Sequence, residues 1–143
     1  GSLYGDSIVT ELIPWVEENY HACAEREYRA IGGISRGGGW AARLAVRNFE
    51  LFGAFGGHSM SLMPGDWWQV RELREVHEPE DFPRIYIDRG ELDYLFNDID
   101  FFEKTLTDYG VPHEFTVRPG AHNVEYWQAH VTEYIEWYAQ GWE

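Results

Sequence analysis

The chain has 143 residues, the length of one domain, and a formal net charge of -14. An acidic surface disfavours nucleic acids and anionic membranes, because both are polyanionic, and no apolar run approaches the roughly 18 residues that a membrane-spanning helix needs. The one cysteine, Cys23, excludes an internal disulfide framework and favours a reducing compartment such as the cytoplasm. We therefore expect a single domain over residues 1–143, with Gly1 and Ser2 set aside as typical of a cloning remnant.

The first element in chain order is a helix. Ile8, Leu12 and Val16 recur at helical spacing with Trp15 beside them, and the pattern ends near Tyr20. The residues that follow, up to the first strand, are typical of a connector. We therefore predict an amphipathic helix ahead of the first strand.

A glycine-rich strand and helix come next. Residues 28–34 (YRAIGGI) are typical of a short strand, and residues 37–48 (GGGWAARLAVRN) of a helix whose small residues pack close to a sheet. Ser35 lies at the junction, among five glycines in the stretch AIGGISRGGGW. A strand and a helix that simply meet need one or two turn residues, so this junction indicates two backbones brought close together around one hydroxyl.

The middle of the chain contains two further strands. Residues 53–59 (GAFGGHS) predict a buried, glycine-rich strand, and residues 84–88 (RIYID) predict the clearest strand, because they alternate and are β-branched. Between them, residues 60–82 are polar and irregular, with a short helix expected from Trp67 to Val76. A helical segment therefore separates each strand from the next.

The last third of the chain repeats this alternation, with a strand predicted at residues 113–117 (HEFTV) between two helices. The first helix has an apolar face made of Leu95, Ile99, Phe102, Leu106 and Tyr109. The second has a stripe made of Trp127, Val131, Tyr134, Ile135 and Tyr138. Strands separated by helices predict an α/β fold with about four parallel strands, right-handed crossovers and helices on both faces, a three-layer sandwich.

Residues 33–37 (GISRG) match the pattern G-x-S-x-G. The pattern is weak by itself, but a predicted strand precedes Ser35 and a predicted helix follows it, which is the setting of a nucleophile elbow. The serine backbone is strained in such a turn, and Gly33 and Gly37 remove side chains where strand and helix approach each other. The alternative, a phosphate-binding turn, lacks the Walker lysine and the G-x-G-x-x-G spacing. Ser35 is therefore the candidate nucleophile.

A serine hydroxyl needs a base, and the base needs a group that orients it. In parallel sheets, functional groups lie on loops beyond the carboxyl ends of the strands. The strand at 84–88 is followed by three carboxylates, Asp88, Glu91 and Asp93, among which the pattern does not choose. The next strand is followed by His122, and the chain order serine, acid, histidine is the order of α/β-hydrolases.

His58 is the rival histidine, because the stretch GGHS also leaves a strand. The other histidines lie in connectors, at the start of a strand or inside a helix, where structural or surface roles are more common. We expect His58 to line the site rather than to act as the base.

Four stretches together carry a resemblance that covers nearly the whole chain: ELIPWVEENY (11–20), AIGGISRGGGWAARLAVRNFELFGAFGGHS (30–59), FPRIYIDRGELDYL (82–95) and GAHNVEYWQAHVTEYIEWYA (120–139). They resemble the esterase D family of α/β-hydrolases, which includes S-formylglutathione hydrolases, feruloyl and acetylxylan esterases, siderophore esterases and mycolyltransferases. Carried over by position, the resemblance implies Ser35 as nucleophile, Asp93 as the acid and His122 as the base.

The resemblance also implies that this chain corresponds to only part of the family's fold. Family members have several strands before the first helix seen here, and those strands bring the loop with the second oxyanion N–H. The chain would thus correspond to the C-terminal half of the hydrolase fold, with the backbone N–H of Arg36 as the oxyanion donor that is present. An apolar strand edge without its neighbour invites pairing with another chain, so we expect a homo-oligomer, in the first instance a dimer.

Other residues near the serine allow two readings each. Arg36 replaces an apolar residue that is frequent in the family, and it could bind an acidic group of a substrate or pair with a nearby carboxylate, which we favour. Trp67 and Trp68 could line the substrate pocket together with His58, or fill space left by the missing half. No paired cysteines, H-x-x-x-H or dinucleotide loop occur, and the NDID stretch at 97–100 lies within a helical pattern, so we expect neither metal nor cofactor.

These observations predict a serine carboxylesterase that hydrolyses small, short-chain or activated esters through an acyl-enzyme, with a small-molecule ester as its partner. Two alternatives stay open. One is a catalytically dead remnant that serves as an oligomerising or binding domain, and the other is an acyltransferase that uses the same three residues.

Overall fold

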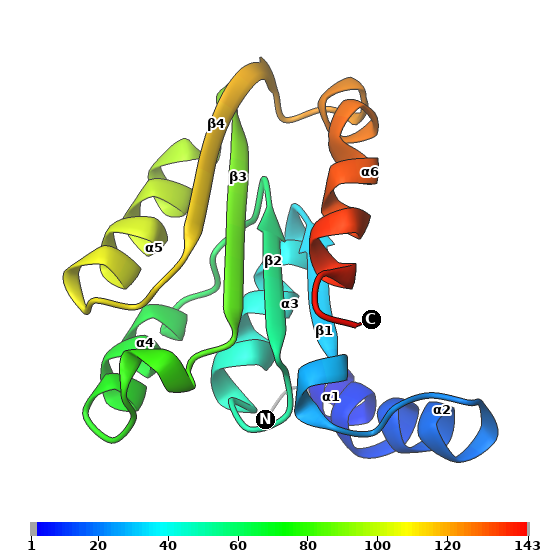
Figure 1. Ribbon diagram of the computed structural model, residues 1–143. Coiled ribbons are helices and arrows are strands. Elements are labelled where there is room, and N and C mark those ends of the chain that lie inside the picture. Colours follow the sequence, from blue (N-terminus) through cyan, green and yellow to red (C-terminus); the bar gives the residue numbers. More distant parts are fainter. Residues whose placement is uncertain (1–2, 143) are drawn as a thin grey trace.

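The computed structural model describes residues 3–142. Its centre is one parallel sheet in the order β1-β2-β3-β4 (Figure 1), formed by β1 (Ala30–Ile34), β2 (Ala54–His58), β3 (Arg84–Leu92) and β4 (Glu114–Ala121). The predicted α/β fold with four parallel strands is confirmed. Since the strands are parallel, their carboxyl ends all lie at one edge of the sheet, where ligands bind in folds of this kind.

Helices cover both faces of the sheet. On one face lie α3 (Arg36–Arg47), α4 (Asp66–Arg74) and α5 (Phe96–Asp108), and on the other lies α6 (Val124–Ala139), as Figure 1 shows. Two short 3-10 turns, at Arg26–Tyr28 and Pro79–Asp81, join the elements. Within residues 3–142, the helices are all too short or too polar to cross a membrane.

The helix before the first strand has three parts: α1 (Leu3–Ser7), a π-helical turn (Ile8–Leu12) and α2 (Ile13–Asn19). The wide turn immediately precedes Pro14, which has no N–H to donate to the preceding turn. A π-helical turn is a common way to absorb one missing hydrogen bond without ending a helix. The prediction of a helix ending near residue 20 is therefore confirmed.

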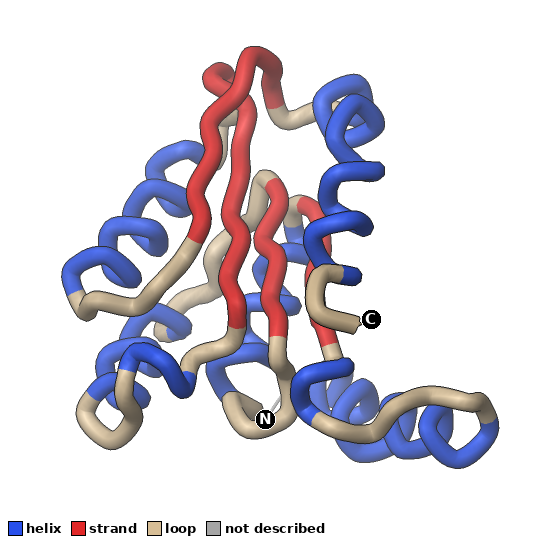
Figure 2. Tube along the Cα trace, in the orientation of Figure 1, coloured by secondary structure: helices blue, strands red, loops and turns tan. Residues whose placement is uncertain are grey.

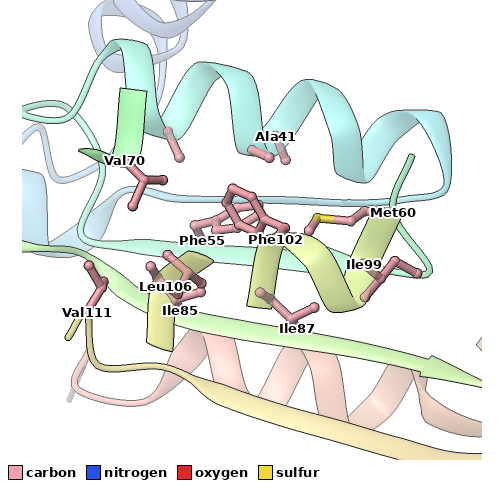
Figure 3. Close-up of a cluster of buried hydrophobic side chains, with 12 residues drawn as sticks. Ala41, Phe55, Met60, Val70, Ile85, Ile87, Ile99, Phe102, Leu106 and Val111 are labelled. Atoms are coloured by element: carbon pink, nitrogen blue, oxygen red, sulfur yellow. The ribbon is translucent and has the colours of Figure 1, made fainter. Parts of the chain in front are cut away.

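The alternation of side chains along the strands builds two cores. Phe55, Ile85 and Ile87 point toward α3, α4 and α5 and form the larger apolar cluster with Phe102 (Figure 3). Residues of the other parity point toward α6, where Tyr86 packs with Tyr134 and Trp137, and Ala54 joins them. The larger core is purely apolar, whereas the core beneath α6 contains aromatic side chains that end in polar groups.

The third and fourth strands are longer than the sequence predicts. Residues 84–88 and 113–117 are the predicted strands, but pairing continues to Leu92, opposite Ala121. Gly90 permits this continuation, because a Cβ there would lie 2.5 Å from the carbonyl oxygen of Gly120. Glycine and proline usually end a strand, so the prediction stopped short of a segment in which glycines let two backbones approach.

The first strand forms one border of the sheet. Among residues 3–142, β2 is its only partner, so the other edge of β1 has no strand beside it. At the amino end of β1, between residues 28–30 and α2, lies a hollow of about 320 Å³. Its apolar lining includes Leu12, Tyr28, Ala30 and Phe52.

Candidate active site

Ser35 occupies a sharp turn between β1 and α3. Its backbone has φ 55° and ψ -121°, a conformation that is strained for a residue with a side chain. A Cβ on Gly33 would lie 2.4 Å from the carbonyl carbon of Gly37, so only glycine allows the strand and the helix to come this close. This is the geometry that the pattern G-x-S-x-G predicts for a nucleophile elbow.

The loop after β2 holds the backbone of Ser35 on both sides. The Ser35 N–H donates to the carbonyl of His58 (2.9 Å), and the Ser61 N–H donates to the carbonyl of Ser35 (3.0 Å). Ser59, between these two residues, also has a positive φ of 47°, and its N–H donates to the carbonyl of Asp88 (2.9 Å). These hydrogen bonds were not predicted from the sequence, because they join backbone groups, which every residue sequence has.

Three residues from three loops form a hydrogen-bonded chain. Ser35 Oγ lies 2.9 Å from His122 Nε2, and His122 Nδ1 lies 3.0 Å and 3.2 Å from the two carboxylate oxygens of Asp93. Asp93 is buried, and the N–H of Leu95 donates to its Oδ1 (2.9 Å), which fixes the carboxylate. The structure thus brings together the three residues that the resemblance selects, at the edge where β1, β3 and β4 end (Figure 2).

Two aromatic rings flank the His122 imidazole. The Trp127 ring meets it edge to face with centroids 5.0 Å apart, and the Tyr94 ring lies 4.5 Å away at 51°. The indole Nε1 of Trp127 is buried without a hydrogen-bond partner among the described residues, whereas Tyr94 is largely exposed. The sequence analysis placed Trp127 on an apolar stripe. Tyr94 could have been identified as a residue beside the site, because it directly follows Asp93.

Arg36 begins α3 directly after the serine. As the first helical residue, it has a backbone N–H without an acceptor inside the helix, which suits it to bind an oxyanion on a substrate held at Ser35. Its side chain is exposed and makes no ion pair with another residue of the segment 3–142. The expectation that Arg36 pairs with a nearby carboxylate is therefore wrong.

A second histidine–carboxylate pair lies beneath α6. His58 Nδ1 is 2.7 Å from Asp88 Oδ1, and His58 Nε2 is 2.8 Å from the hydroxyl of Tyr138. The other carboxylate oxygen of Asp88 accepts hydrogen bonds from Tyr126 and Tyr134, each at 2.7 Å. We call these five residues the buried cluster. Both nitrogens of His58 are engaged and its ring is buried, so the structure corrects the expectation that this side chain lines the substrate pocket.

The buried cluster keeps its phenols protonated. Burial, followed by the charge of Asp88, raises the pKa of Tyr126, Tyr134 and Tyr138 far above the ordinary value. Burial also raises the pKa of the adjacent Tyr86 to about 12. A neutral phenol can donate its proton to a buried carboxylate, so the Asp88 carboxylate is stabilised by several neutral donors together with the guanidinium of Arg118, which lies 3.9 Å from its Oδ2.

Trp67 and Trp68 stack on each other in the first turn of α4, with ring centroids 3.9 Å apart. Trp67 also meets Phe101 of α5 edge to face, at 5.7 Å. The preceding residue, Asp66, accepts a hydrogen bond from Arg43 (2.9 Å), two turns along α3 from Ser35. The indoles therefore lie beside the middle of α3, and their role as pocket residues stays a prediction.

Within residues 3–142, His, Cys, Asp and Glu form no group of three or more that could hold a metal ion. The acidic stretch at residues 97–100 lies in the first turns of α5, where Asp100 binds the guanidinium of Arg89 (2.6 Å). These carboxylates thus belong to a helix surface and an ion pair.

Comparisons with known proteins bear on the family and on the fold. Residues 2–138 match the model of the family described as "Putative esterase". An esterase of Mycobacterium tuberculosis is 35% identical over 51 residues, which are 36% of this chain and 11% of that protein. A ferulic acid esterase superposes with a TM-score of 0.79 at 26% identity, covering 94% of this chain and 60% of that one. An S-formylglutathione hydrolase from Staphylococcus aureus superposes with a TM-score of 0.83 at 21% identity, covering 96% and 62%. The chain thus spans about 60% of the length of these solved enzymes.

Proposed function

The chain belongs to this esterase family, and we propose that it is a serine carboxylesterase acting on small, short-chain or activated esters. The observation that carries the proposal is the continuous hydrogen-bonded chain from Ser35 through His122 to Asp93. A hydroxyl, an imidazole and a buried carboxylate in this order are the groups that nucleophilic catalysis at a carbonyl requires.

The first half of the proposed reaction forms an acyl-enzyme. Ser35 Oγ attacks the ester carbonyl while His122 Nε2 takes its proton, and the carbon–oxygen bond to the alcohol then breaks as His122 returns that proton to the alcohol oxygen. Asp93 accepts the Nδ1–H of His122, which fixes the tautomer and stabilises the transient imidazolium.

The second half hydrolyses the acyl-enzyme. Water enters where the alcohol left, gives one proton to His122 and attacks the carbonyl carbon. The bond from that carbon to Ser35 Oγ then breaks, Ser35 takes the proton back from His122, and the carboxylic acid leaves. The negative oxygen of both tetrahedral intermediates would be held by the N–H of Arg36, in line with the positive end of the α3 dipole. One oxyanion donor of this kind contributes about 10²–10³-fold to the rate.

We further propose that the unpaired edge of β1 associates with the same edge of a second copy. A two-fold axis would place the two β1 strands antiparallel and let one apolar patch cover its own copy. What supports this is the exposed edge itself, with Leu12 and Tyr28 exposed beside it. Size-exclusion chromatography coupled to light scattering over a hundredfold range of concentration tests it, and a monomer at every concentration would contradict it.

The test of the esterase activity compares the wild type with Ser35→Ala on p-nitrophenyl acetate, together with labelling by a fluorophosphonate. We expect hydrolysis and labelling in the wild type, with both lost in the variant at unchanged circular dichroism. Equal background rates and no label on either protein would indicate a non-catalytic binding domain. Addition of an alcohol acceptor to the same assay reveals acyl transfer as ester product.

A further inference from the structure

We propose that Tyr94 forms the binding surface for the alcohol part of the ester, and that this surface selects neutral aromatic alcohols. The inference rests on the proposed function and adds the substrate class. It follows from where the alcohol must be during the reaction and from what surrounds that position.

The position of the alcohol is fixed by proton transfer. His122 Nε2 lies 2.9 Å from Ser35 Oγ, and the departing alcohol oxygen must come within hydrogen-bonding distance of the same nitrogen to receive its proton. The acyl group, by contrast, is attached to Ser35 and has its oxygen toward the N–H of Arg36. The first carbons of the alcohol therefore lie beside the imidazole of His122.

The surface beside the imidazole is aromatic. The His122 side chain is only 7% exposed, because Trp127 and Tyr94 pack against it. Trp127 is largely covered, whereas Tyr94 is 70% exposed with its ring centre 4.5 Å from that of His122. A group leaving Nε2 toward solvent thus meets the ring of Tyr94, which can stack against a second ring.

The neighbours of Tyr94 favour a neutral, apolar group. Leu92 is 78% exposed and pairs across the sheet with Ala121, the residue before His122. Val124 is also exposed, two residues beyond the histidine. Glu91, three residues before Tyr94, and Glu125, three residues after His122, are exposed carboxylates, and they would repel an anionic alcohol or thiol.

The experiment compares kcat/KM for benzyl acetate and ethyl acetate. Both esters give the same acetyl-enzyme, so the ratio of the two values reports only on the alcohol. We expect the wild type to prefer benzyl acetate and Tyr94→Ala to lower the benzyl-to-ethyl ratio about tenfold, the effect of losing one aromatic contact with its buried area. Tyr94→Phe keeps the ring and should keep the ratio. Tyr20→Ala, an exposed tyrosine at the end of α2, is the matched control and should leave it unchanged.

Two results would overturn the inference. One is an unchanged ratio in Tyr94→Ala, and the other is an equal loss on both esters, which would make Tyr94 a positioning residue for His122. If the wild type hydrolyses neither ester, the proposed function fails. Binding of benzyl alcohol then tests separately whether Tyr94 forms a surface for an aromatic alcohol. Shifts of the His122 ring signals in NMR titration that Tyr94→Ala abolishes would support it, and a wild type without shifts would overturn it.

Discussion

Among residues 3–142, two of the histidine–carboxylate pairs have almost the same geometry in opposite settings. His122 and Asp93 lie at the carboxyl edge of the sheet with nitrogen and oxygen 3.0 Å apart, and His58 and Asp88 lie beneath α6 at 2.7 Å. A hydroxyl group lies within hydrogen-bonding distance of the second nitrogen of each imidazole. Ser35 is 2.9 Å from His122 Nε2, and Tyr138 is 2.8 Å from His58 Nε2. Distances alone therefore do not separate a catalytic pair from a structural one.

The difference lies in the hydroxyl and its surroundings. Ser35 belongs to a strained turn at the amino end of α3, where backbone N–H groups can stabilise a new negative charge. The phenol of Tyr138 is instead enclosed between α6 and the sheet, close enough to Gly56 that a Cβ there would lie 1.9 Å from its oxygen. A substrate can reach the first hydroxyl and cannot reach the second, so the first pair is suited to proton transfer and the second to stability.

Exchange of the two histidines for alanine is the strongest way to break this comparison. His122→Ala should lower kcat/KM for p-nitrophenyl acetate by about 10⁴-fold or more, because it removes the base. The loss of thermal stability should be smaller than in His58→Ala, because the buried carboxylate of Asp93 loses one donor but keeps the N–H of Leu95. His58→Ala should do the reverse, with a large loss of stability and near-normal activity per folded molecule. Activity assays and thermal denaturation of both variants measure the two effects, and similar losses of activity in the two would refute the assignment.

The sequence predicted what depends on pattern and chain order. Glycine at position 33 is required for the close approach of strand and helix, and the residues that follow the strands lie at one edge of the sheet, so Ser35 and His122 could be selected. The same expectation for Gly37 is wrong, because a Cβ there would meet nothing within 4 Å. Asp93 could be selected as the acid only through the resemblance to the esterase D family, because the sequence pattern did not distinguish it from Asp88 and Glu91. Asp88 in fact still lies within β3, which continues to Leu92.

The sequence could not predict the buried cluster. Tyr126, Tyr134 and Tyr138 are spaced along α6 by eight and four residues, a spacing that reads as an ordinary apolar stripe. Tyr126 and Tyr134 share the acceptor Asp88, 38 and 46 positions earlier, and Tyr138 pairs with His58, 80 positions earlier, so the network exists only once α6 packs on the sheet. The absence of a partner for Arg36 likewise depends on which carboxylates the fold brings near it.

Removal of the buried charge sharpens the comparison at the level of stability. Asp88→Asn keeps the shape but loses hydrogen bonds from His58, Tyr126 and Tyr134 to a charged acceptor. We expect the free energy of unfolding to fall by about 2–4 kcal/mol, measured by urea denaturation, while folded protein still hydrolyses ester. Asp93→Asn is the matched control, with activity lost and a smaller loss of stability, because Asp93 accepts from two groups, His122 and the N–H of Leu95, rather than from three.

Alkaline pH should affect the buried cluster before the site. In the unfolded chain tyrosines ionise near pH 10, but in the folded protein burial raises the pKa of Tyr86 to about 12 and that of the cluster phenols further. The folded state therefore holds these protons more tightly, and the stability that this supplies is present below pH 10 and lost as pH rises through 12. We expect unfolding free energy to fall by roughly 1 kcal/mol or more per pH unit above 10.

Ultraviolet absorbance of tyrosinate gives the check on the alkaline prediction. The tyrosinate signal of Tyr86 and of the cluster phenols should appear together with loss of circular dichroism. Ionisation of every tyrosine in a single step near pH 10, with the fold intact, would contradict the buried arrangement.

The smallest expected effect is that of Tyr138→Phe, which removes one hydroxyl from the end of the buried cluster. His58 Nε2 loses its 2.8 Å partner while Asp88 keeps its bonds to the histidine and to two other phenols. The cost should be about 1–2 kcal/mol in urea denaturation, the range for one buried polar group left unpaired. The rate of ester hydrolysis should not change, because Ser35 is held by the carbonyl of His58 and not by its ring. A fall in kcat without a fall in stability would mean that the ring of His58 also controls the conformation of the turn at Ser35. The two histidine–carboxylate pairs would then be coupled.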